Sequence, residues 1–144
     1  MNEQPRLRVT TYAVVVRDGS VLLTRLSEAS PVFEPGNWHL PGGGMDPGEQ
    51  PCDALTRELQ EEAGLPVLEA KLLDARSYMA ERNDVKWNVI SMLYGARVGA
   101  GEPRVTEVGG SSDAIEWVPI DRVRELPLSP PARDGLRLME TVSW

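Results

Sequence analysis

The stretch Gly43–Leu65 constrains this chain more than any other, because it joins a Gly- and Pro-rich loop to a helix at a fixed spacing of charged residues. The loop half can form neither a helix nor a central strand. The second half predicts a helix over Pro51–Ala63, since proline suits a first helical turn and Gly64, with Pro66 beyond it, ends a helix. We therefore expect a loop that leads directly into one well-defined helix.

The two sides of this helix differ in chemistry when its residues are placed at about 100° intervals around the axis. One side is apolar, and we expect it to pack on the body of the protein. It consists of Cys52, Leu55, Leu59 and Ala63. Another side is crowded with carboxylates at positions i, i+3 and i+4. These are Glu58, Glu61 and Glu62.

The three glutamates repel one another, so a positively charged partner would stabilise the helix. Like charges four residues apart destabilise an exposed helix by about 0.2–0.5 kcal/mol, and no basic residue separates Glu58 from Glu62 on that face. The small neighbours Ala54 and Pro51 leave room for a close approach. A divalent cation accounts for this pattern, and ligands that are all oxygen suit Mg²⁺ or Mn²⁺ better than Zn²⁺. The alternative is an acidic face that is simply solvated.

The residue spacing of the whole stretch favours a bound divalent cation over a solvated acidic face. The stretch resembles the Nudix box and departs from its pattern nowhere, and a chance match is rarer than about one in a million for a chain of this length. The matching residues are Gly43, Glu49, Arg57, Glu58, Leu59, Glu61, Glu62, Gly64 and Leu65. A looser resemblance, which includes Trp38 to Gly43, covers most of the chain. It implies an α/β protein with the Nudix fold, a mixed β-sheet sandwiched between α-helices.

The resemblance also implies roles. Glu61, Glu62 and the Gly43 carbonyl are expected metal ligands, and Glu58 is either a further ligand or the base that takes a proton from water. Arg57 is expected to orient a glutamate of the box, with Glu49 as its partner. In similar proteins a further carboxylate often approaches the metal from the loop before the last strand. The candidates here are Glu107, Asp113 and Glu116, of which Asp113 is the best placed.

Composition limits the partners of the chain. Its 144 residues suit a single domain over 1–144 with a real core. The net charge of −7 argues against binding a nucleic-acid polymer, but it leaves open a small phosphorylated substrate whose charge a metal neutralises. No apolar run is long enough to span a membrane, and the first residues lack the apolar region of a signal peptide. One cysteine fits a reducing cytoplasm.

Alternating and β-branched segments around the box predict a series of strands. The strands are expected at Arg8–Val16, Val21–Arg25, Trp38–Leu40, Val67–Met79, Trp87–Val98 and Ala114–Pro119. Turns are expected at Arg17–Ser20 and Glu81–Asp84. A short helix should open at Pro119 and reach Glu125. After a break at Leu126–Pro131, a terminal helix should run over Ala132–Trp144.

Aromatic side chains are the candidates for holding the organic part of a substrate, since small-ligand sites are largely apolar. We expect this role of Trp87 first, and of Phe33 and Tyr78 as further contacts. Phe33 lies in the Ser27–Asn37 loop and is expected to be exposed. His39, the only histidine, is expected to be structural because it lies outside the box.

The expected function is metal-dependent hydrolysis of a pyrophosphate linkage in a nucleoside diphosphate joined to another moiety. Nucleoside triphosphates, ADP-ribose-like compounds, sugar nucleotides and dinucleoside polyphosphates all stay open. One alternative is a non-catalytic ligand-binding module, which would need an eroded box. Another is an isoprenoid diphosphate isomerase, which relies on a cysteine in the site. Cys52 is expected on the packing side, which argues against that chemistry. Similar proteins are commonly dimers, so a homodimer stays open as well.

Overall fold

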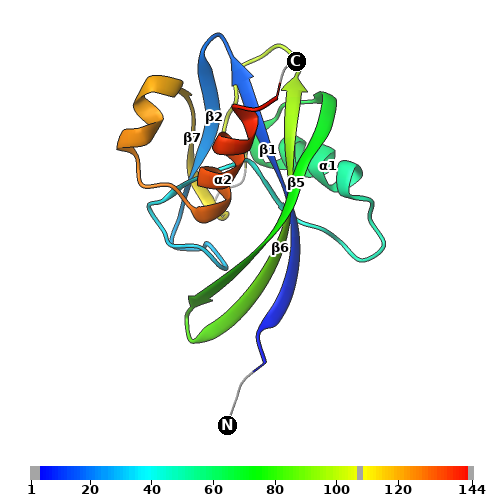
Figure 1. Ribbon diagram of the computed structural model, residues 1–144, viewed down its shortest axis with the longest axis vertical. Coiled ribbons are helices and arrows are strands. Elements are labelled where there is room, and N and C mark those ends of the chain that lie inside the picture. The colour runs from blue at the N-terminus through cyan, green and yellow to red at the C-terminus, as the bar shows by residue number, and fades with distance from the viewer. Residues whose placement is uncertain (1–3, 107–108, 143–144) are drawn as a thin grey trace.

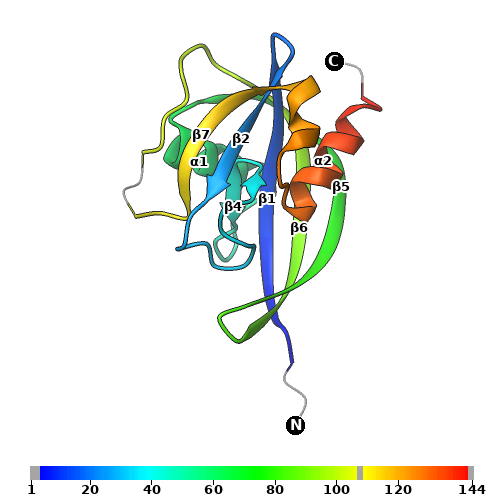
Figure 2. The same cartoon turned by 90° about the vertical axis from the view of Figure 1, so that its left-hand side faces the viewer.

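Long β-strands dominate the computed structural model, which describes residues 4–106 and 109–142 (Figure 1 and Figure 2). The strands are β1 (Arg6–Arg17), β2 (Ser20–Leu26), β3 (Trp38–His39), β4 (Gly42–Gly44), β5 (Val67–Arg82), β6 (Val85–Val98) and β7 (Ser112–Pro119). The helices are α1 (Pro51–Ala63), the 3-10 helix η1 (Ile120–Glu125) and α2 (Pro130–Met139).

The strands form a mixed sheet in the order β3-β2-β1-β6-β5, with β4 added to β1 and β7 to β2. β1 and β6 run parallel, and the other paired strands are antiparallel. β1 joins the two halves of the sheet, because its first ten residues pair with β6 and its last two pair with β2. The expected mixed sheet is confirmed.

Helices cover both faces, as the alternation of side chains along β1 requires. Val14 points to one face and packs in a cluster with Ala132 of α2. Its neighbours Ala13 and Val15 point to the other face and pack with Leu55 and Leu59 of α1. Figure 2 shows the two helices on opposite sides of β1. The expected layering is therefore present.

Helix α1 has the predicted bounds because its end signals are local. Proline occupies its first turn, and Gly64 ends it with a φ of 72° that favours glycine. The second helix was predicted less well. It begins at Pro130, where the Ser129 side chain caps the helix by accepting a hydrogen bond from the Ala132 N–H, and it ends at Met139. Pro131 was expected to break the chain, but it lies in the first turn, where proline is tolerated.

The hairpin of β5 and β6 is longer than expected. Strand β5 continues to Arg82, and the turn is confined to Asn83 and Asp84, both with positive φ. The glycine segment Gly42–Gly44, expected to be loop, is the short strand β4 paired with β1. This pairing positions the site described below.

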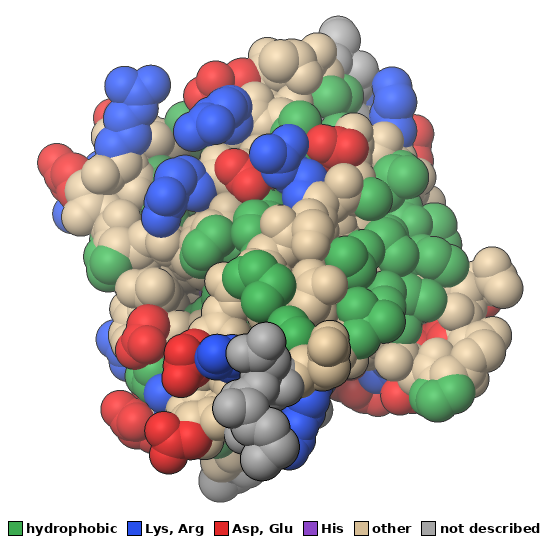
Figure 3. Space-filling view, turned by 60° about the horizontal axis from the view of Figure 1, so that its bottom comes forward, with side chains coloured by type: hydrophobic (Ala, Val, Ile, Leu, Met, Phe, Trp, Pro, Cys, Tyr) green, Lys and Arg blue, Asp and Glu red, His purple; other side chains and the backbone are tan. Residues whose placement is uncertain are grey.

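One face of the β1, β6 and β5 strands stays open beyond α1. Leu7 and Met79 both pair with Asn88, so they share that face, and they are 66% and 64% exposed. Figure 3, with the bottom of the molecule turned forward, shows apolar side chains gathered over a broad area. Within residues 4–106 and 109–142, every helix is too short or too polar to cross a membrane.

Candidate active site

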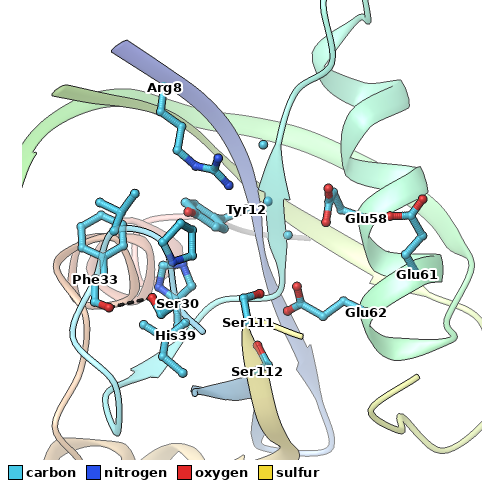
Figure 4. Close-up of a pocket in the computed structure, with 16 residues that line it drawn as sticks. Arg8, Tyr12, Ser30, Phe33, His39, Glu58, Glu61, Glu62, Ser111 and Ser112 are labelled. Atoms are coloured by element: carbon cyan, nitrogen blue, oxygen red, sulfur yellow. Dashed lines mark hydrogen bonds between the residues drawn. The ribbon is translucent and has the colours of Figure 1, made fainter. Parts of the chain in front are cut away.

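A cavity of about 230 Å³ lies beside the glutamate side of α1 (Figure 4). Its walls come from β1, β4, α1, the loop that precedes β3 and the start of β7. Glu58, Glu61 and Glu62 line it together with Gly43. The structure thus brings four of the five residues expected to bind metal to one place, and Asp113 is not among them.

Helix α1 lies directly against the glycine strand β4. A Cβ atom added to Gly43 would stand 2.6 Å from Oε2 of Glu58, a separation that real Cβ atoms do not tolerate. Ala54, which was expected on an open acidic side of the helix, is buried. Glycine at position 43 is therefore required for the Glu58 carboxylate to reach the backbone of β4.

Arg57 holds the acidic residues in place. Its Nε and Nη2 atoms donate to the two oxygens of Glu49 at 2.9 and 2.8 Å, a two-pronged geometry that is strong and directional. Its Nη1 donates to Glu58 at 2.9 Å and to Glu61 at 3.3 Å. Nη2 also donates to the Gly44 carbonyl at 3.0 Å. One guanidinium thus ties together the loop, the glycine strand and the helix.

The electrostatics of this cluster follow from those hydrogen bonds. The bond from Arg57 and the backbone N–H of Asp46 lower the pKa of Glu49 from 4.5 to about 2. The carboxylates in turn raise the pKa of Arg57 further above its ordinary value, chiefly through the bond to Glu49. Both groups are charged across the physiological range.

The donor set fits a hard divalent cation. It offers three carboxylates and a backbone carbonyl, with no sulfur or imidazole ligand among them, which suits Mg²⁺ or Mn²⁺. In the part of the chain that the structure describes, no three Asp, Glu, His or Cys side chains converge at metal-binding spacing. Glu58 and Glu61 share the Nη1 atom of Arg57, and a cation would compete with it for their oxygens.

The end of the cavity away from α1 carries aromatic side chains (Figure 4). The His39 ring is buried, lies 4.4 Å from the Tyr12 ring and 5.5 Å from the Phe33 ring, and hydrogen-bonds through Nδ1 to the Ser129 hydroxyl. Burial lowers the pKa of His39 to about 3, and burial is also the largest cause that raises the pKa of Tyr12 to about 12. Both side chains are neutral near pH 7, as a structural role for His39 requires.

The three expected aromatic contacts fall in different places. Phe33 lines the cavity, but it is only 7% exposed, so its expected exposure was wrong. It packs in a small cluster with Leu26, which the sequence pattern of a loop does not reveal. Tyr78 and Trp87 pack against this cluster from outside the cavity, and Tyr78 donates its hydroxyl to Asp134 at 2.8 Å.

The expected later carboxylates do not reach the cavity in the described residues. Ser112, at the start of β7, lines the cavity, whereas the next residue, Asp113, lies at an irregularity in the pairing of β7 with β2 and does not line it. Asp113 instead accepts a hydrogen bond from Arg25 at 2.7 Å. Glu116 lines a separate cavity beside Trp38. Glu107 lies outside the described residues.

Cys52 is exposed and does not line the cavity, so its expected place on the packing side was wrong. Helix α1 buries Ala54, Leu55, Leu59 and Ala63 instead. The sequence argued against cysteine-dependent isomerase chemistry because Cys52 was expected to be packed. The structure argues against it because Cys52 does not line the cavity.

Arg8 and Tyr12 are among the cavity residues that the sequence interpretation missed. Both lie on β1 and are separated by an even number of residues, so they point to the same face. The alternation of side chains along β1 could have shown that Arg8 and Tyr12 share a face. The pairing of β1 with the glycine strand, which brings these side chains to the glutamates, was not visible in the sequence.

A model of the NUDIX domain family matches residues 6–139. The chain belongs to the Nudix family. The MutT Nudix hydrolase from Burkholderia pseudomallei is similar over 95% of this chain and 99% of its own, with a TM-score of 0.77 and 33% identity. A MutT protein from Methanosarcina mazei shares the fold, with a TM-score of 0.76 and 24% identity over 96% and 97% of the two chains. The resemblance and the Nudix fold are thus confirmed.

Curated relatives match over a shorter length. A protein from Escherichia fergusonii named nucleoside triphosphatase NudI is 44% identical over 59 residues, which are 41% of each chain. Its namesake from Escherichia coli O1:K1 is 41% identical over 63 residues, or 44% of each chain. The match therefore spans less than half the length of these curated relatives.

Proposed function

We propose that this Nudix protein is a metal-dependent hydrolase that cleaves a pyrophosphate linkage in a nucleotide. One observation carries the proposal: Glu58, Glu61 and Glu62 line the same cavity as Gly43, and Arg57 links two of them. A solvated acidic face would not need a guanidinium that links the helix to the loop and the glycine strand, or a glycine that makes room for a carboxylate.

Glu61, Glu62 and the Gly43 carbonyl would hold the cation, with Glu58 beside them. When bound, Mg²⁺ or Mn²⁺ neutralises charge on phosphate oxygens and lowers the pKa of a water molecule. The protein's own contribution is positioning. Arg57 fixes the carboxylates of Glu58 and Glu61 on the cavity side of α1, and Glu49 fixes Arg57. Preorganised charge of this kind costs no rearrangement during reaction.

Glu58 serves this site either as a ligand or as the base for the attacking water, and one variant separates the two roles. Glu58→Gln removes the charge and keeps the shape. A ligand role predicts that the variant loses metal affinity and turnover together. A base role predicts that it binds Mn²⁺ normally and still fails to turn over. We expect no base role for His39, because its imidazole is buried and its Nδ1 is hydrogen-bonded to Ser129.

A nucleotide substrate is supported by the relatives and by the shape of the site. The first curated relatives are named nucleoside triphosphatases. The Nudix domain of Shewanella oneidensis NrtR, which shares the fold at 19% identity and a TM-score of 0.72, was crystallised with ADP ribose. In this chain the aromatic end of the cavity, with Phe33 and Tyr12, offers apolar contact for part of a nucleoside.

A substrate panel tests the proposal. Purified protein is incubated with nucleoside triphosphates, ADP-ribose, sugar nucleotides and dinucleoside polyphosphates in Mg²⁺, in Mn²⁺ and in excess chelator. Release of phosphate, pyrophosphate and nucleoside monophosphate is measured. We expect at least one substrate to be cleaved at its pyrophosphate linkage, and we expect chelator to abolish the cleavage. Cleavage that continues in chelator, or no cleavage of any substrate with either metal, would contradict the proposal.

A further inference from the structure

Arg8 is the one Arg or Lys side chain among the described residues that line the cavity. It lies on β1, two residues before Thr10, which pairs with Gly44 of β4. In Figure 4 the Arg8 guanidinium and the Glu58 carboxylate lie on opposite sides of β4. The cavity thus has an acidic wall and a basic side chain, with the glycine strand between them.

The two adjacent glycines of β4 explain how both charges come so close. A Cβ atom on Gly43 would stand 2.6 Å from Oε2 of Glu58, and one on Gly44 would stand 3.2 Å from Nη2 of Arg8. Successive residues of a strand face opposite sides, so each glycine makes room for one of the two charged groups. The glycine strand thus lets a carboxylate lie close on one side and a guanidinium on the other, and the contact is tighter at Gly43.

The two arginines at the site differ in the ion pairs that they form. Arg57 is bound to Glu49, Glu58 and Glu61. Arg8 forms no ion pair with any Asp or Glu of the described residues. A guanidinium beside a cavity, with its donors available, is suited to phosphate oxygens, which it can bind in a two-pronged manner.

We propose that Arg8 is a specificity-determining residue that binds a phosphate group beyond the two that form the hydrolysed linkage. The preferred substrate is then a nucleoside triphosphate or a longer polyphosphate, and a nucleoside diphosphate sugar is disfavoured because its third group is uncharged. The inference rests on the proposed function and names its substrate class.

The kinetic test compares each nucleoside triphosphate with the nucleoside diphosphate sugar of the same base, in saturating Mg²⁺. We expect wild-type kcat/KM to be higher for the triphosphate. Arg8→Gln should raise the KM for the triphosphate by about 10- to 100-fold, the usual range for a charge-assisted contact, and change that for the sugar nucleotide less than about threefold. Arg8→Lys should recover part of the loss.

Arg6→Gln is the matched control. Arg6 lies on the same strand and the same face, is exposed, and does not line the cavity, so this variant removes an equal charge outside the site. We expect it to behave as wild type toward both substrates. An equal loss in Arg6→Gln would show a general charge effect and would overturn the specific role of Arg8.

Calorimetric binding of a methylene-bridged, non-hydrolysable nucleoside triphosphate gives a second readout that does not depend on turnover. Arg8→Gln should weaken this binding by about 10- to 100-fold, and Arg6→Gln should not weaken it. Equal binding by wild type and Arg8→Gln, or an equal effect of Arg8→Gln on both substrate classes, would overturn the inference while leaving the hydrolase proposal intact. If the wild type hydrolyses no substrate but Arg8→Gln still weakens triphosphate binding, only the hydrolase proposal is refuted.

Discussion

Burial of the single histidine makes the stability of this protein depend on pH in a calculable way. His39 is 5% exposed and is packed between the rings of Tyr12 and Phe33. Its pKa falls from 6.5 in the unfolded chain to about 3 in the folded protein, because burial disfavours the imidazolium. Between these two values the unfolded state binds a proton that the folded state does not, so stability rises with pH across this range.

The size of the effect follows from the two pKa values. Each pH unit below 6.5 costs about 1.4 kcal/mol, so at about pH 5 the free energy of unfolding should be about 2 kcal/mol lower than at about pH 7.5. Urea denaturation at the two pH values measures this difference. His39→Gln cannot titrate, and its two free energies of unfolding should agree to within about 0.5 kcal/mol over the same interval.

The proton can also be followed directly, because the chain has one histidine and the C2–H signal of its imidazole is therefore unambiguous in a proton NMR spectrum. We expect no titration of that signal above about pH 4. A midpoint near the ordinary value of 6.5, or equal wild-type stability at both pH values, would refute the burial argument for His39.

Three further predictions concern other side chains. Arg57→Lys keeps the charge but loses the two-pronged bond to Glu49, so turnover should fall about 10- to 100-fold, and an unchanged kcat would contradict the positioning role. Cys52→Ser changes an exposed residue outside the cavity, so neither Tm nor turnover should change, whereas a folded but inactive variant would revive the isomerase alternative. Phe33→Leu should raise KM more than Trp87→Phe does, since only Phe33 lines the cavity; the opposite order in steady-state kinetics would restore Trp87 as the substrate contact.

Local signals were sufficient for helix α1 and its acidic face. Proline and glycine mark the ends of the helix, and the spacing of Glu58, Glu61 and Glu62 places their side chains together without any tertiary information. Six of the seven strands were predicted with errors of a few residues at their ends, and β4 was expected to be loop. β5 and β6 are longer than predicted because they extend each other through pairing. Near the turn between β5 and β6, the alternation of apolar and polar residues is too weak to predict where the strands end.

Contacts between distant residues explain what the sequence did not predict. Phe33 is buried because the loop that carries it folds back onto Leu26 and His39, and loop composition suggests exposure. Asp113 turns away from the cavity because β7 pairs with β2 in a register that brings Asp113 to Arg25. Arg8 was missed because only the pairing of β1 with the glycine strand carries it to the cavity. Pairing between strands decides the placements of Asp113 and Arg8, and the path of a loop decides that of Phe33.

Metal binding by the glutamate cluster is the central claim, and Mn²⁺ binding followed by electron paramagnetic resonance tests it most directly. Glu62→Gln removes one charge from the cavity, and Asp53→Asn removes one from an exposed position on the same helix as a matched control. We expect Glu62→Gln to bind Mn²⁺ at least about tenfold more weakly than wild type and to lose about 100-fold or more in turnover. Asp53→Asn should match wild type in both. Equal Mn²⁺ affinity in wild type and Glu62→Gln would contradict the assignment of this cluster as the metal site.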